Sequence, residues 1–123
     1  DVTGLGSLSV NGDSVAENFT WQDIAIADDA ATSFSVPFAS LVFIHTQGNS
    51  TRRALFHAKA DGAPAVNAFG TQGSSVTLTT GALTGTTGAD NAVTYSTTNG
   101  NLYIENRSGN TRTFTIGVFG GNQ

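Results

Sequence analysis

The sequence predicts an all-β fold, an antiparallel β-sandwich that is jelly-roll-like and whose last three strands form a meander. Composition is the first reason, because the 123 residues include 18 Thr, 11 Ser, 10 Asn and 15 Gly but one Lys, two Glu and no Met. Thr favours strands, Asn, Ser and Gly favour turns, and Lys, Glu and Met are good helix formers. Turn signals also divide the chain at short, even intervals, which is typical of sandwiches and barrels.

Length and charge narrow the class of protein. We expect one domain over residues 1–123, with a frayed tail over residues 120–123, because the length leaves no room for a second core. No apolar run approaches the roughly 18 residues of a membrane-spanning segment, and without Cys there is neither a disulfide nor a thiolate metal site. Five basic residues against nine carboxylates make no basic surface for nucleic acid. The sequence therefore predicts no membrane, nucleic-acid or cofactor partner.

The first five strands are expected between turn residues in the N-terminal half of the chain. They are Val2–Val10, Val15–Ala27, Ser33–Val36, Ala39–Thr46 and Thr51–Ala60. The run Phe38–Ile44 is apolar at odd and even positions alike, which predicts a central strand covered on both faces. After a looser segment at Pro64–Phe69, a strand is expected at Ser75–Thr79 and a long loop at residues 80–90.

The C-terminal third permits an argument about strand register. Asn99-Gly100 is the strongest hairpin signal, because a type I′ turn needs positive φ at both central residues, and it pairs Tyr95 with Ile104. At Ser108-Gly109-Asn110, a three-residue loop would set Ile104 against Phe114 and keep the apolar residues on one face, which a one-residue slip would invert. The predicted meander is therefore Val93–Ser96, Leu102–Arg107 and Thr111–Phe119. In that register Glu105 lies opposite Thr113, as a cross-strand charge partner near Arg107 and Arg112.

Residues with catalytic or metal-binding chemistry are few and scattered. His45 and His57 fall on neighbouring predicted strands, but a metal site there would also need Asp28 or Asp61, and a packed or hydrogen-bonded strand histidine is the competing interpretation. Asp28-Asp29 is more typical of a capped turn than of a calcium loop, whose spacing is missing. No Gly-x-Ser-x-Gly elbow and no Gly-rich phosphate loop before a helix occurs. The sequence therefore predicts no metal site and a protein that is not an enzyme.

Exposed aromatic rings among Asn, Asp and Thr are the usual means by which lectin-like β domains bind sugar. The aromatic residues with a polar atom are Trp21, Tyr95 and Tyr103. Tyr95 falls on the predicted apolar face and is assigned to the core, which leaves Trp21 and Tyr103 as candidate carbohydrate-binding residues. Burial of the single Trp in the core or at an interface is the alternative interpretation.

Two segments of the chain resemble a known family. GALTGTTGADNAVTYSTTNGNLYIENRSGNTRTFTIGVF, residues 81–119, places a Thr/Gly loop before a hairpin, a strand reading aromatic-Ile-Glu-Asn-Arg, and a last Thr-rich strand. IADDAATSFSVP, residues 26–37, has a similar character. These segments resemble small virion proteins of tailed bacteriophages. The resemblance implies a jelly-roll-like shell, fibre or decoration subunit displayed in many copies, and it brings no catalytic residues.

Partners and location follow from this resemblance. Identical β subunits that bury apolar faces on one another, or on a capsid, gain stability without a disulfide or a metal. The expected partners are copies of the same chain, a trimer among the options, and other virion proteins, with the chain at the virion surface and outside the cell. The candidate interface residues are Phe38, Leu41, Phe43 and Leu55, although burial inside a two-sheet sandwich competes for Phe43.

The function expected from the sequence is therefore that of a non-enzymatic bacteriophage virion protein, a capsid decoration or head-fibre subunit. The alternative is the receptor-binding tip of a tail fibre, or a lectin-like domain, that binds carbohydrate on the host cell surface.

Overall fold

The protein is seen in a computed structural model that describes residues 9–10, 13–14, 19–48, 52–71 and 75–120. Its strands are β1 (Ser9–Val10), β2 (Asp13–Ser14), β3 (Phe19–Ile26), β4 (Ala30–Ser35), β5 (Ala39–Thr46), β6 (Ala54–Lys59), β7 (Ala65–Thr71), β8 (Val76–Thr80), β9 (Val93–Thr98), β10 (Asn101–Asn106) and β11 (Arg112–Gly120). Within these ranges no helix is long and apolar enough to cross a membrane.

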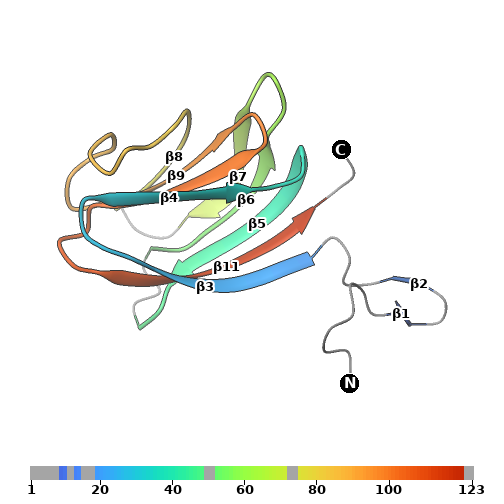
Figure 1. The fold of residues 1–123 in the computed structure, drawn as a ribbon, viewed down its shortest axis with the longest axis horizontal. Coiled ribbons are helices and arrows are strands. Elements are labelled where there is room, and N and C mark those ends of the chain that lie inside the picture. The colour runs from blue at the N-terminus through green and yellow to red at the C-terminus, as the bar shows by residue number, and fades with distance from the viewer. Residues whose placement is uncertain (1–8, 11–12, 15–18, 49–51, 72–74, 121–123) are drawn as a thin grey trace.

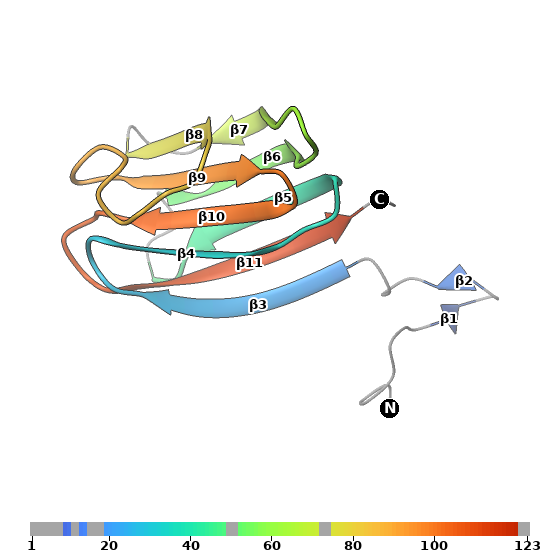
Figure 2. The same cartoon turned by 45° about the horizontal axis from the view of Figure 1, so that its top comes forward.

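Two sheets stacked face to face form the body of the molecule (Figures 1 and 2). One sheet has the strand order β3-β11-β5-β6-β7 and the other has the order β4-β10-β9-β8, while β1 and β2 pair with each other. The predicted all-β sandwich is confirmed. Residues 2–8 of the first predicted strand, 15–18 of the second and 121–123 of the predicted tail lie outside the described residues.

The jelly-roll-like part of the topology lies where early strands pair with late ones. β3 pairs with β11 in the larger sheet, and β4 pairs with β10 in the smaller sheet. The chain therefore crosses between the sheets four times, from β3 to β4, from β4 to β5, from β7 to β8 and from β10 to β11. β8 and β9 run parallel, whereas the other described pairings are antiparallel.

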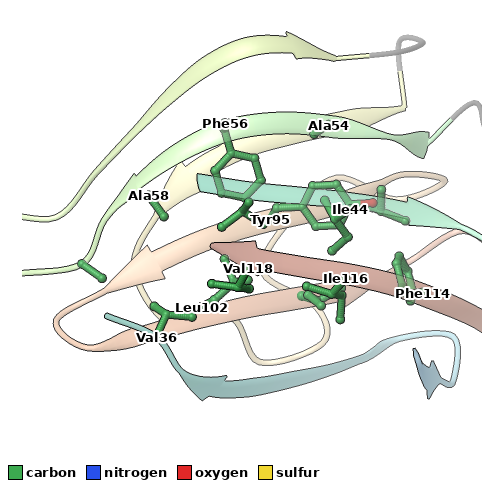
Figure 3. Close-up of a cluster of buried hydrophobic side chains, with 14 of the residues drawn as sticks. Val36, Ile44, Ala54, Phe56, Ala58, Tyr95, Leu102, Phe114, Ile116 and Val118 are labelled. Atoms are coloured by element: carbon green, nitrogen blue, oxygen red, sulfur yellow. The ribbon is translucent and has the colours of Figure 1, made fainter. Parts of the chain in front are cut away.

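Apolar side chains from the inner faces of both sheets fill the space between them (Figure 3). Val42, Ile44, Phe56, Ile104 and Phe114 are among the fully buried ones. At the centre, the ring of Tyr95 from the smaller sheet stacks on Phe56 at 6.4 Å and meets Phe114 edge-on at 6.3 Å, both from the larger sheet. The two sheets thus share one core.

The predicted hairpin register is confirmed and the predicted meander is wrong. β9 and β10 pair Thr98 with Asn101 and Tyr95 with Ile104, as the Asn-Gly turn requires. β11, however, does not pair with β10 but lies in the other sheet, between β3 and β5. The physical reason is that Ile104 and Phe114 do belong to one apolar core, but from opposite sheets, so the buried layer between the sheets serves both strands.

Three smaller expectations are corrected as well. The looser segment at Pro64–Phe69 belongs to a regular strand, β7, which has a bulge opposite Leu55 and Phe56. Gly120 is part of β11 and not of a frayed tail; a side chain there would collide with the ring of Pro37. β5 has the predicted bounds and a central position, but only one of its faces is buried, because Leu41 and Phe43 point away from the core and stay exposed.

Candidate functional site

An apolar surface covers the outer side of the five-stranded sheet, and we call it the apolar face. It consists of the side chains of Trp21, Leu41, Phe43, Leu55 and Phe119. Strand register places them in two adjacent rows, because Gly117 lies opposite both Trp21 and Phe43, and Phe43 lies opposite Leu55. In the next row Phe119 lies opposite Leu41. The five side chains therefore form one continuous surface.

The exposure of these side chains sets them apart from the core. Trp21 is 56% exposed and Phe119 57%, while Leu41, Phe43 and Leu55 are 42%, 40% and 37% exposed. On β5, Val42 and Ile44 alternate with Leu41 and Phe43 and are fully buried. This strand therefore has one buried apolar side and one exposed apolar side. Contiguous exposed apolar side chains of this kind are typical of surfaces that bind a partner.

A hollow of about 230 Å³ opens on this surface between β5, β6 and β7. Its walls are Phe43, Leu55, Arg53, Gly70 and Thr71, with Ala54. A Cβ placed on Gly70 would find no atom within 4 Å, so open space lies beside this glycine at the β7 side of the hollow. Arg53 is the charged residue among those that line the hollow.

Polar groups border the apolar face on β3, β11 and β5, in the row next to that of Trp21 and Phe43. The hydroxyl of Thr115 donates to Asp23 Oδ1 at 2.7 Å and accepts from the amide of Gln47 at 3.1 Å. The imidazole of His45 meets the ring of Phe43 edge-on at 5.6 Å. An apolar centre with a polar border is the usual anatomy of a protein contact surface.

The structure does not assemble the metal site considered from the sequence. His45 and His57 share the outer face of the five-stranded sheet, but His57 lies opposite Leu41 and His45 lies opposite Thr115. The two imidazoles are thus four residues out of register. Among the described residues no group of three or more His, Asp or Glu side chains is placed to hold a metal ion.

The two candidate sugar-binding aromatic residues lie on opposite sides of the sandwich. Trp21 belongs to the apolar face, whereas Tyr103 lies on β10 between Ser33 and Ser96 in the four-stranded sheet. Tyr103 therefore cannot act together with Trp21. Of the candidate interface residues, Leu41, Phe43 and Leu55 lie together on the apolar face, and Phe38 precedes β5 with 41% of its surface exposed.

Glu105 has a role that the sequence did not indicate. Instead of pairing with Thr113, its side chain is fully buried under the loop of residues 81–92. Its carboxylate accepts hydrogen bonds from the backbone N–H groups of Gly85 and Thr87, both at 2.9 Å, and of Gly88 at 2.6 Å. Alternation along β10 does place Glu105 on the outer face, but only the structure shows that a loop covers that face.

The same loop is fixed at its edge by Arg107. The guanidinium donates to Asp29 Oδ1 at 2.9 Å and to the carbonyl oxygen of Gly88 at 2.7 Å, and it lies 3.8 Å from Asp90. The hydrogen bond to Asp29 raises the pKa of Arg107 above its usual value. Asp28, in the same turn, accepts from the backbone N–H of Gly109. The Asp28-Asp29 pair thus ties loops together.

Tyr95 connects the core to the border of the hollow. Its hydroxyl donates to the carbonyl oxygen of Arg52 at 2.7 Å, next to Arg53 in the chain. Burial raises the pKa of Tyr95, because the ionised phenol would lose its hydration. The phenol stays protonated and acts as a hydrogen-bond donor that holds the turn before β6.

Phe119 is the member of the apolar face that the sequence did not single out. It belongs to the series Thr115, Gly117 and Phe119, which alternates with the buried Ile116 and Val118. The sequence shows that alternation, but which side of β11 faces the core depends on the sheet to which β11 belongs.

Comparison of the chain with protein-family models, with curated proteins and with solved structures found no match.

Proposed function

We propose that this chain is a non-enzymatic structural subunit of a bacteriophage virion, a capsid decoration or head-fibre protein displayed at the virion surface in many copies. The observation that carries the proposal is the apolar face. Five large apolar side chains, each 37–57% exposed, are aligned by strand register on one side of a rigid sheet. A partner that covers them gains the hydrophobic free energy that the isolated chain leaves unused.

The roles of the charged groups support a structural function. The carboxylate of Glu105 is occupied by three backbone donors, and Asp29 and Asp90 neighbour Arg107. These groups hold loops in place, which is a structural task. The resemblance of residues 81–119 to small virion proteins supports the location outside the cell.

Co-sedimentation tests this function directly. Capsids of the phage that encodes the chain, assembled without it, are mixed with increasing amounts of the purified chain and pelleted. We expect saturable binding with a fixed number of copies per capsid, as a lattice of equivalent sites requires. A chain that stays in the supernatant at every ratio, and is missing from purified virions by mass spectrometry, would refute the proposal.

Carbohydrate binding is the second candidate function, favoured by the exposure of the Trp21 indole beside other apolar side chains. An indole face of this kind stacks on sugar rings, although Tyr103 cannot contribute. A glycan array compares the unchanged chain with Trp21→Ala, using Tyr103→Ala as the control. Binding that Trp21→Ala abolishes and Tyr103→Ala preserves would support this second function.

A further inference from the structure

The two halves of the apolar face differ in shape in a complementary way. Across the sheet, one row runs Trp21, Gly117, Phe43, Leu55 and Gly70, from β3 to β7. At the β3 end the row carries an indole that is 56% exposed. At the β6–β7 end it carries the hollow of about 230 Å³, bordered by Phe43, Leu55 and Gly70. One end of the row protrudes and the other end is recessed.

The charges on this face are also distributed in a complementary way. Asp23 lies on β3 two residues after Trp21, and Arg53 lies two residues before Leu55 on the rim of the hollow. Between them, on the same side of the row, stand Thr115 and His45, which lie opposite each other. An acidic group therefore marks the β3 end of this face and a basic group marks the β6 end, both displaced in the same direction along the strands.

We infer that the apolar face binds a second copy of this chain, related to the first by a two-fold axis that runs along the strands between β11 and β5. This axis exchanges β3 with β6 and β11 with β5. Trp21 of each copy then enters the hollow of the other, beside its Leu55. Each Phe43 lies over the Gly117 of the other copy, which has no side chain, and each Phe119 meets a Leu41.

The same rotation brings unlike charges together. Asp23 of one copy faces Arg53 of the other, and because the interface is isologous this contact occurs twice. The sheets of the two copies then stack about 10 Å apart with nearly aligned strands, as the sheets of a sandwich do. Two chains paired in this way form a four-layer unit whose outer surfaces are polar.

A two-fold axis at right angles to the strands, through the row of Trp21 and Phe43, fits less well. It would place Phe43 on Phe43 and Trp21 on Trp21, large side chain against large side chain. It would also place His45 on Leu41 and Thr115 on Phe119, polar against apolar. Size and charge therefore both select the axis along the strands.

This inference rests on the proposed role of the apolar face and names its occupant. The test uses the chain's single Trp as a probe. Sedimentation equilibrium of the purified chain is recorded over a wide range of concentrations, together with acrylamide quenching of Trp21 fluorescence. We expect a monomer–dimer equilibrium, with Trp21 becoming protected from acrylamide in step with dimer formation.

Filling the hollow is the most direct perturbation. Gly70→Leu places a side chain where a Cβ has open space, so the fold tolerates it while the indole of the partner is shut out. We expect self-association to weaken roughly 30-fold or more, as when a central Trp contact is lost, and Trp21 to stay accessible to acrylamide. The control is Gly62→Leu, also in open space but in the turn after β6, which leaves the dimer intact.

Exchange of charges tests the direction of the axis. Asp23→Arg and Arg53→Asp should each weaken the dimer, and the double variant should restore it, because the pair is rebuilt with its signs reversed. Asp90→Arg, on the loop that covers the other sheet, is the control with an equal change of charge and should leave the dissociation constant of the dimer unchanged.

The outcomes separate this inference from the proposed function. A strict monomer, a trimer, or a dimer in which Trp21 remains fully accessible would overturn the two-fold arrangement, even if the chain still binds capsids. A dimer with protected Trp21 and a restoring double variant upholds the arrangement, even if the chain never binds a capsid and the proposed virion function fails.

Discussion

The two outer faces of the sandwich differ in the polarity of their side chains and in whether a loop covers them. On the four-stranded sheet the outward residues include Thr94, Ser96 and Glu105, yet all three are buried, because the loop of residues 81–92 lies over them. On the five-stranded sheet the outward residues include Trp21, Leu41, Phe43, Leu55 and Phe119, which remain 37–57% exposed. The loop of residues 81–92 thus covers a polar face and makes hydrogen bonds with it. The apolar face stays exposed.

The largest expected effect contrasts the two sides of a single strand. Ile44→Ala removes a fully buried side chain from β5 and should lower the free energy of unfolding by about 3 kcal/mol. Leu41→Ala, on the exposed side of the same strand, should cost the monomer less than about 1 kcal/mol. Urea unfolding at a concentration where the chain is monomeric measures both. Equal losses would mean that the apolar face is already covered in the monomer.

Removing the Glu105 carboxylate, which holds the loop over the four-stranded sheet, should have the next largest effect on stability. Glu105→Ala leaves the backbone N–H groups of Gly85, Thr87 and Gly88 without their acceptor and should lower the free energy of unfolding by about 2–3 kcal/mol. Glu105→Gln keeps one acceptor oxygen and should lose less. Hydrogen exchange should show faster exchange at these three amides in both variants. Unchanged protection in Glu105→Ala would show that the loop is held by other contacts.

A substitution at Gly88 tests how closely the loop of residues 81–92 packs on the four-stranded sheet. A Cβ on Gly88 would collide with Thr94 and with the carboxylate of Glu105, so Gly88→Ala must push the loop outward. We expect a loss of about 2 kcal/mol, typical of overpacking. Gly62→Ala, where the added Cβ has open space, serves as the control and should change stability little. Thermal unfolding followed by circular dichroism distinguishes the two variants.

The smallest effect is expected at the edge of the loop. Asp29→Asn removes the charge that pairs with Arg107, while Asn tolerates the positive φ of this residue, 53°. The Asp29 side chain is 51% exposed, so water and salt screen the pair and its loss should hardly change the melting temperature. The measurement is the change of the melting temperature with salt concentration, which should be smaller in Asp29→Asn than in the unchanged chain. A large loss of stability would show that the ion pair is essential for holding the loop.

Features that depend on neighbouring residues were predictable from the sequence. The Asn99-Gly100 turn determines the pairing of β9 with β10, and the turn signals on either side predict the bounds of β5. The pairing of β10 with β11 was not predictable, because Ile104 and Phe114 share an apolar surface whether they lie side by side or face to face. Only the completed sandwich distinguishes these arrangements.

The candidate site was predictable in part for the same reason. Leu41, Phe43 and Leu55 were expected at an interface, and they share the apolar face. Their continuity with Trp21 and Phe119 depends on β11 lying between β3 and β5, which is a long-range pairing. The burial of Glu105 likewise depends on a loop that begins more than twenty residues earlier in the chain.

The pairing of β3 with β11 has a consequence for how the molecule folds. Thr115 donates to Asp23 across 92 residues of chain, so this part of the sheet forms only when most of the domain is in place. Contacts between residues so distant in sequence slow folding, since a large loop must close before they stabilise anything. Until then the apolar sides of β3, β5 and β11 are not joined in one sheet and are exposed to other unfolded chains. The apolar face of the folded domain is therefore built from strand sides that are prone to aggregate before folding is complete.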